Sequence, residues 1–439
     1  MIRCSHVRTG AVIAFILALP IAARANPDSL VPSAIPPQPG EPTNLVMTLT
    51  YDYEADHAQI EREQVGPGVP ANGPIPLQKD LEWKQNSHTI TPRVDIGILR
   101  DAWIYGALPI VIAQSRDLRL DSGVSYGTSS TVASKLVPTG GYAASDPTTP
   151  PGGSEVFEGP NRHGLDQVDA GLGIALMNQA RDDTKPTWKI GAEARIAIGR
   201  VARFDPTEPT ANTAVGQGAH EVRLWTTFDR RLGWAEPWLE LYWQVPLAYT
   251  SASLFQNPGS GATNTGKGQI AGANFGFEAY AITTPDQNRI SLDIGARIIG
   301  HFEGREYTPL WEMLAYAGSP TNSGPLVWYP NPLSPGAMAS QYPGISNVEN
   351  YLETGARVAV RAQLGPHVRF AVLGDAVWVS DHAITFADAG VDRNGNMLID
   401  PNSNEVNPLH VDAIDLVGHR YHSVHELDFI IGVQGQVLF

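Results

Sequence analysis

Apolar and polar residues alternate along long stretches of this chain. Near the amino end, apolar side chains stand at every second position, with polar ones between them: Leu45, Met47, Leu49, Tyr51 and Tyr53 against Thr48, Thr50, Asp52 and Glu54. The same period recurs in residues 428–439, DFIIGVQGQVLF, where Phe429, Ile431, Val433, Val437 and Phe439 share one face. A period of two predicts β-strands with one apolar and one polar face.

About twelve such segments follow one another, each of roughly ten residues or more, the length that a tilted strand needs to cross hydrocarbon. Short connections, such as those around 180–186, 284–288 and 364–367, follow every second segment, and long connections rich in Gly, Pro, Ser and Thr follow the others. This layout predicts an all-β fold, a transmembrane antiparallel up-and-down β-barrel of about 12 strands with short periplasmic turns and long extracellular loops. Both ends of the barrel then lie on the short-turn side. Residues 124–164 are long enough to hide a hairpin, so ten or fourteen strands also stay open.

The polar faces of these segments distinguish a membrane barrel from a soluble β-sandwich. A sandwich exposes its polar face to bulk water and tends to carry many Lys and Glu there. Here that face is rich in glycine with scattered charges of both signs, and the apolar face is almost free of charge. Six aromatic residues near strand ends are expected in the interfacial girdles of a membrane barrel: Tyr53, Trp103, Trp188, Trp238, Tyr249 and Trp378.

The amino-terminal residues have the features of a secretory signal peptide. Arg3 and Arg8 precede a short apolar run, and Ala23-Arg24-Ala25 is a small-x-small cleavage site. We therefore expect residues 1–25 to be a signal peptide, 26–42 a proline-rich lead-in, and 43–439 the barrel.

Composition excludes some classes of partner and site. Without the signal peptide the chain keeps 27 basic and 45 acidic residues, a formal charge near −18, which argues against nucleic acid as a partner. The single cysteine, Cys4, lies in the predicted signal peptide, so disulfides and thiolate metal sites are not expected.

The signal peptide, the alternating strands and a last strand ending in Phe439 together resemble the Gram-negative outer-membrane β-barrel superfamily; no particular family is recognised within it. This resemblance implies the outer membrane as location, with its lipids and lipopolysaccharide as surroundings. It also implies that the barrel assembly machinery reads the last strand.

Charged residues on the predicted inward faces are the candidate functional residues. They would either pair across a filled lumen or line a wet pore, and we expect a porin-like channel that passes small solutes passively, without enzymatic activity. The predicted pore-lining residues are Arg93, Asp95, Glu193, Arg195, Arg223, Glu278, Asp293, Arg297, Arg357, Arg361, Arg369 and Asp375. The alternatives are a structural or adhesive barrel with cation-binding loops and a lipid hydrolase.

One long loop contains TPLWEMLAYAG, residues 308–318. Thr308 at the cap, Pro309 at the first position and Gly318 at the end predict a short helix. Its apolar side chains either constrict the pore from inside or pack on neighbouring loops at the rim.

The loop VDRNGNMLIDPNSNE, residues 391–405, resembles the calcium loops of EF-hand and dockerin type. The candidate ligands, for a structural Ca²⁺ only, are Asp392, Asn394, Asn396, the Leu398 carbonyl and Asp400. Met397 replaces the expected glycine and Ser403 the bidentate glutamate, so an ordinary Asn-Gly turn is the alternative.

The hydrolase alternative depends on residues 418–426, GHRYHSVHE. Ser423 and His425 are two apart, and the pattern places both on the outward face of the last strand, with His419 nearby. A Ser–His pair is a possible nucleophile, but residues two apart on a strand stand roughly 7 Å apart, too far for a direct hydrogen bond.

Overall fold

The computed structural model describes residues 45–65, 75–99, 101–179, 181–259, 261–286, 288–319, 325–326 and 341–439. The predicted signal peptide (1–25) and lead-in (26–42) lie outside these residues, as does Arg100 of the first predicted short turn.

Twelve antiparallel strands close a barrel, as the alternating pattern predicted. In order around the barrel they are β1 (Leu45–Glu63), β2 (Leu77–Leu99), the two-part strand β3 (Ala102–Ala107) and β4 (Ile110–Leu120), the two-part strand β7 (Arg162–Leu165) and β8 (Gln167–Met177), β9 (Thr187–Ala197), β10 (Ala219–Asp229), β11 (Ala235–Tyr249), β12 (Ile270–Thr283), β13 (Arg289–His301), β16 (Tyr351–Leu364), β17 (Val368–Val379) and β19 (Tyr421–Leu438). The last strand, β19, pairs with β17 on one side and with β1 on the other, which closes the sheet.

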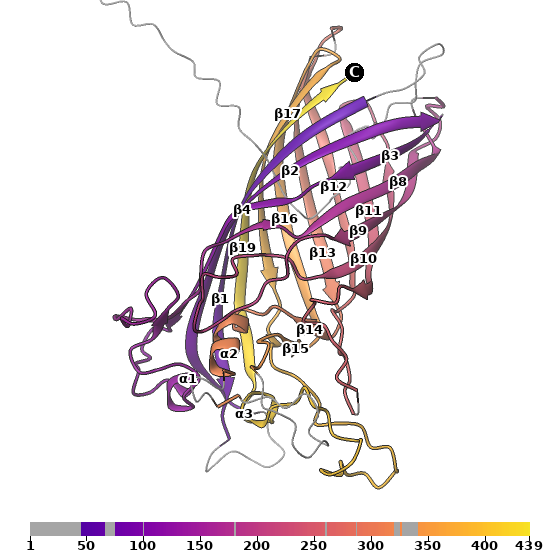
Figure 1. Cartoon of the computed structure of the whole chain (residues 1–439). Coiled ribbons are helices and arrows are strands. Elements are labelled where there is room, and N and C mark those ends of the chain that lie inside the picture. Colours follow the sequence, from indigo (N-terminus) through magenta and orange to yellow (C-terminus); the bar gives the residue numbers. More distant parts are fainter. Residues whose placement is uncertain are drawn as a thin grey trace, which may run out of the picture.

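The connections divide the molecule into two ends. The short connections, Leu45 and Phe439 lie at one end, the upper one in Figure 1. The long connections at the other end contain α1 (Ser130–Ala133), β5 (Tyr142–Ala143), β6 (Glu155–Glu158), β14 (Gly304–Glu306), α2 (Trp311–Ala317), β15 (Ser346–Val348), β18 (His382–Ala383) and α3 (Asp412–Asp415). By the rule that outer-membrane barrels keep short turns in the periplasm, the long loops are extracellular.

The outward face of the barrel carries a belt of exposed apolar side chains on every strand. Examples are Leu172 (57% exposed), Val358 (50%) and Ile431 (58%). Exposing so many apolar residues to water is energetically costly, whereas contact with lipid hydrocarbon is not. The belt therefore marks the membrane-spanning zone.

β1 reverses its polarity halfway along. Towards the periplasm Met47 and Leu49 are exposed, whereas beyond Ala55 the outward side chains are polar and Ala58 and Ile60 face inward, both fully buried. β2, β4 and β19 continue alongside this extracellular half of β1. These four strands therefore form a wall that extends past the belt on the extracellular side. Its outer face is polar and its inner face is apolar.

The inside of this wall holds a soluble-type hydrophobic core, which we call the mouth core. Strand residues Ile60, Leu81, Trp83 and Leu118 pack there against side chains of the long loops. In Figure 1 all three helices lie at this end, beside the extended strands. Among the described residues, no helix is long and apolar enough to cross a bilayer.

The expected aromatic girdles are wrong at two positions. Trp103 and Trp238 are 2% and 8% exposed and point into the barrel, where Trp238 donates a hydrogen bond to Asp293 Oδ1 (3.0 Å). Trp103 packs there with Tyr105 and Trp225, and its indole N–H has no hydrogen-bond partner among the described residues. Closeness to a strand end therefore did not determine which face these two residues occupy.

Candidate functional site

The loop after β14 turns back into the extracellular mouth of the barrel; we call its residues 307–318 the plug. Its helix α2 begins at Trp311 rather than beside Thr308, and its amino-terminal cap residue, Leu310, makes no side-chain capping hydrogen bond. Trp311 N instead donates to the Thr308 carbonyl (3.1 Å), so a turn precedes the helix. Gly318 ends the helix, as the sequence predicted.

The plug is almost fully buried. Leu310, Trp311, Met313 and Leu314 are each at most 1% exposed, and they belong to the mouth core together with inward residues of β1, β2 and β4 and with loop residues such as Phe204. The two alternatives that the sequence left open thus describe one arrangement, because the plug enters the barrel and also packs on neighbouring loops.

A buried ion pair holds the plug in place. Arg162 Nε on β7 donates to Glu312 Oε1 on α2 (2.6 Å), Arg162 Nη1 donates to the Ala214 carbonyl (2.8 Å), and the guanidinium lies 4.7 Å from the centre of the Trp311 ring. Both residues are buried. Gly159 lies so close to Glu312 that a Cβ there would collide with the carboxylate.

Below the plug lies a chamber of three lobes, with volumes of about 250, 340 and 150 Å³. We call them the first, second and third lobes. Tyr307 of the plug lines all three, and its hydroxyl donates to the Ala202 carbonyl (3.2 Å). Burial raises the pKa of Tyr307 far above its usual value, so it acts as a neutral divider between the lobes.

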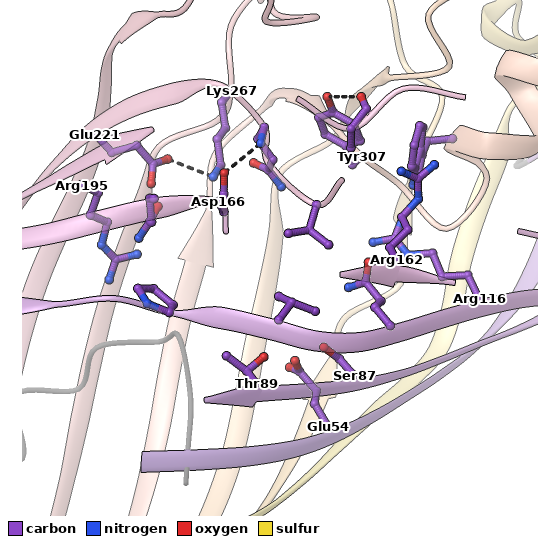
Figure 2. Close-up of a pocket in the computed structure, with 18 of the residues that line it drawn as sticks. Glu54, Ser87, Thr89, Arg116, Arg162, Asp166, Arg195, Glu221, Lys267 and Tyr307 are labelled. Carbon is purple, nitrogen blue, oxygen red and sulfur yellow. Dashed lines mark hydrogen bonds and ion pairs between the residues drawn. The ribbon is translucent and has the colours of Figure 1, made fainter. Parts of the chain in front are cut away.

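Charged residues from several strands line the first lobe, which Figure 2 shows. Arg116 and Arg162 lie at one side of this view, and Lys267, Glu221 and Arg195 lie at the other. Most of these charges are paired: Lys267 Nζ lies 3.0 Å from Glu221 Oε1, and Arg195 Nε lies 2.9 Å from Glu193 Oε1. The lobe is thus a polar space inside a wall of ion pairs.

The predicted pore-lining residues all stand on inward faces of the strands, and the structure brings many of them together in pairs. Arg93 contacts Asp95 (2.7 Å), Arg195 contacts Glu193, Arg361 contacts Asp293 (2.9 Å), and Arg297 contacts Asp375. Arg223 pairs with Glu240 (2.8 Å), which the prediction had not included. Glu278 accepts from Tyr280 (3.1 Å) and Ser291, Arg369 donates to Gln363 (3.2 Å), and Arg357 lies on the same inward face of β16. That they line a conducting pore stays a prediction.

Aromatic side chains fill the space between these pairs on the periplasmic side. Trp103, Tyr105 and Trp225 form a buried cluster, and Tyr105 donates to Glu193 Oε2 (2.9 Å). The guanidinium groups of Arg93 and Arg223 lie 4.0 and 3.9 Å from the ring centres of Tyr105 and Tyr242. Aromatic rings and ion pairs thus occupy this part of the lumen together.

Of the charged residues of the first lobe, the sequence predicted Arg195 and missed the others. Arg116 follows the stretch where the alternation is blurred, since Pro109 interrupts the strand between β3 and β4 and a bulge shifts the register opposite His88. Arg162 lies in the long segment with no clear period. The reversed phase of β1 beyond Ala55 was the available signal, because it indicates a strand that outgrows the membrane.

The loop at 391–405 is organised around carboxylates that accept backbone N–H groups. Asp392 accepts from Gly395 N (2.7 Å) and Met397 N (2.8 Å), which lowers its pKa, and Asn394 Nδ2 donates to Asp400 Oδ2 (3.0 Å). Buried Glu405 accepts from Arg393 N and Asp400 N (both 3.0 Å). Asn396 Oδ1 accepts from Leu398 N (2.8 Å). Within the described ranges no group of three His, Cys, Asp or Glu side chains is arranged around a metal position, and calcium binding stays a prediction.

The predicted Ser423–His425 pair is wrong. Ser423 is 1% exposed, faces inward and donates to Glu426 Oε2 (2.5 Å), whereas His425 is exposed with φ of 52° and contacts Gln59 Oε1 (3.1 Å). A register shift in the pairing of β1 with β19 lies at this point. The bulge turns the two side chains to opposite faces, which removes the geometry that a nucleophile and its base need.

Comparisons with known proteins give similarity to solved structures only. No family model and no curated protein matches the chain. An outer-membrane channel (COG4313) from Pseudomonas putida F1 has 9% identity and a TM-score of 0.39, covering 92% of this chain and 99% of its own. A Pseudomonas aeruginosa FadL homologue has 7% identity and a TM-score of 0.33, covering 90% of each chain. The outer-membrane protease OmpT from Escherichia coli has 9% identity and a TM-score of 0.27, covering 90% of this chain and 96% of its own. At such scores the similarity carries no argument about function.

The closed barrel, the apolar belt and the division of short and long connections define an integral outer-membrane β-barrel protein.

Proposed function

We propose that this protein is a channel through which small polar solutes pass passively, with no reaction at the barrel. The observation that carries the proposal is the chamber below the plug, a polar space inside the barrel lined by charged residues from many strands. A solute that enters this space loses bound water, and the polar lining provides contacts that replace it. The ion pairs on the periplasmic side of the chamber supply further polar contacts along the barrel axis.

Planar-bilayer recording tests the proposal. Purified protein should give discrete current steps, and replacing residues 308–318 by a Gly-Ser linker of equal length should increase the conductance, because it empties the mouth. If neither the protein nor this variant gives any steps at any voltage, the proposal is wrong.

Ion selectivity gives a second measurement. Arg361→Gln leaves Asp293 without its guanidinium and adds a net negative charge to the lumen, so the channel should become more cation-selective. Arg119→Gln on the outward face of β4 is the matched control and should leave selectivity unchanged.

A further inference from the structure

The first lobe contains two charged side chains, Arg116 and Glu54, whose charged ends form no ion pair with any described residue. Arg116 donates from Nε to Gln85 Oε1 and lies 5.8 Å from the centre of the Trp311 ring. Within the described residues, its two terminal nitrogens make no hydrogen bond or ion pair. The carboxylate of Glu54 likewise makes none there, and both side chains line the lobe.

These two residues differ in this respect from the other charges of the lobe. Arg162, Arg195 and Lys267 each contact a carboxylate at 3.0 Å or less. Asp166 accepts from Gln217 N (2.9 Å). The carboxylates of Glu312 and Asp56 act on Arg116 electrostatically, but no hydrogen bond or ion pair within the described residues joins either of them to it. Arg116 and Glu54 are both half-buried, so their charged groups keep hydrogen-bonding capacity for a solute that enters the lobe.

The strand register gives the distance between the Cα atoms of the two residues. Glu54 on β1 lies opposite Ser87 on β2, and Arg116 on β4 lies opposite Gln85, so the two residues are two strands and two residues apart. With normal strand spacing and rise, their Cα atoms are about 12 Å apart. Both side chains belong to the lining of the first lobe, as Figure 2 shows, and no hydrogen bond or ion pair joins them.

A solute with one charge of each sign complements these two side chains. The carboxylate of an α-amino acid accepts hydrogen bonds from a guanidinium, and its ammonium group donates to a carboxylate. We propose that the first lobe binds small zwitterions of the amino-acid class, with Arg116 on the carboxylate and Glu54 on the ammonium group.

The rest of the lobe is consistent with this ligand. Its volume of about 250 Å³ lies just below the range of roughly 300–1,000 Å³ for sites of drug-sized ligands, so it takes a smaller solute. Tyr307 and Trp311 supply ring surface beside Arg116 for an apolar side chain. The proposal deepens the proposed channel function, since it names the class of solute.

Calorimetric titration of the full chain in detergent tests the site without any need for conductance. Three probes share one carbon skeleton: leucine carries both charges, 4-methylpentanoate lacks the ammonium group and isoamylamine lacks the carboxylate. Leucine should bind at least about tenfold more tightly than either, because each end contributes a charge-assisted hydrogen bond.

Variants then assign each end. Arg116→Gln should weaken leucine binding at least about tenfold and leave isoamylamine binding unchanged, and Glu54→Gln should do the same with 4-methylpentanoate as the unaffected probe. The matched controls Arg119→Gln and Glu61→Gln lie on the outward faces of the same two strands and should change nothing. Circular dichroism and heat-modifiable mobility on gels confirm that the variants fold.

Three outcomes would overturn the zwitterion site: equal binding of all three probes, no leucine binding, or leucine binding that neither variant changes. Current steps without leucine binding would leave the channel standing and remove the site. Leucine binding without current steps would leave the site standing and remove the channel.

Discussion

At the scale of single residues, Arg162 is the side chain on which the position of the plug depends most. It is buried, it contacts Glu312 and the Trp311 ring at once, and its remaining donors reach loop carbonyls. Removing one member of a buried ion pair costs about 3–5 kcal/mol, because the other charge is left without a partner. This cost falls on the docked plug, since the barrel strands keep their own hydrogen bonds.

We therefore expect Arg162→Ala to increase the frequency or the size of channel openings in planar bilayers, while the barrel keeps its heat-modifiable mobility on gels. Arg203→Ala is the control and should behave as the parent protein does, because the Arg203 side chain donates to the Ala252 carbonyl and forms no ion pair within the described residues. Unchanged conductance in Arg162→Ala would mean that the plug stays docked without this contact.

We expect His382 to make the stability of the loop after β17 depend on pH. The ring is buried, stacks on Tyr351 at 4.2 Å and contacts the Ser380 carbonyl through Nδ1 (2.8 Å); burial lowers its pKa to about 4. A histidine whose pKa is depressed on folding stabilises the fold above its unfolded value near 6.5, and this contribution is lost as pH falls from there to about 4. The whole effect is about 3 kcal/mol at most.

Hydrogen exchange should therefore show faster opening of residues 380–420 at pH 4.5 than at pH 7. His382→Phe keeps the stacked ring without a titrating group, so most of this difference should disappear in that variant. An equal pH response in both proteins would assign it to other groups.

At the scale of elements, residues 391–405 give the clearest test of a sequence motif. Asp392, Asn394 and Asp400 lie in one turn, but much of their hydrogen-bonding capacity is taken up by N–H groups of the same loop. If Ca²⁺ binds there, millimolar Ca²⁺ should slow hydrogen exchange of this loop, and Asp392→Ala should abolish the effect. Slowing that persists in Asp392→Ala would place the ion elsewhere, for example at bound lipopolysaccharide.

Elements differ in how far their sequence predicted them. The strands were predicted well because the period of two is repeated in each of them. Only one strand register places all the apolar side chains of a strand on the lipid face. The first turn of α2 was predicted wrongly because Thr308 has the residue type of a cap, whereas packing of the apolar side chains determined where the helix begins. The face of Ser423 was wrong because one bulge in β19 changes the parity of the pattern.

At the scale of the whole molecule, substitution by arginine should have different effects on barrel stability in the belt and in the extended wall. Ile431→Arg on the lipid face of β19 should destabilise the barrel by about 2–4 kcal/mol, whereas Gln59→Arg on the outward face of β1 above the belt should be nearly neutral. Urea unfolding in lipid vesicles measures both. Equal effects would mean that the wall is also immersed in lipid and that the polarity reversal has another cause.

The sequence by itself determined the class of this protein: a closed barrel, its two ends and the face that meets lipid. Alternation is a local property, and each strand reports its own faces without reference to the others. Only the tertiary structure decided what the interior holds. The plug, the pairing of luminal charges and the meeting of Arg116 and Glu54 in one lobe depend on which strands become neighbours and on where bulges shift the register. These contacts join residues far apart in the sequence, and the alternation within one strand does not predict them.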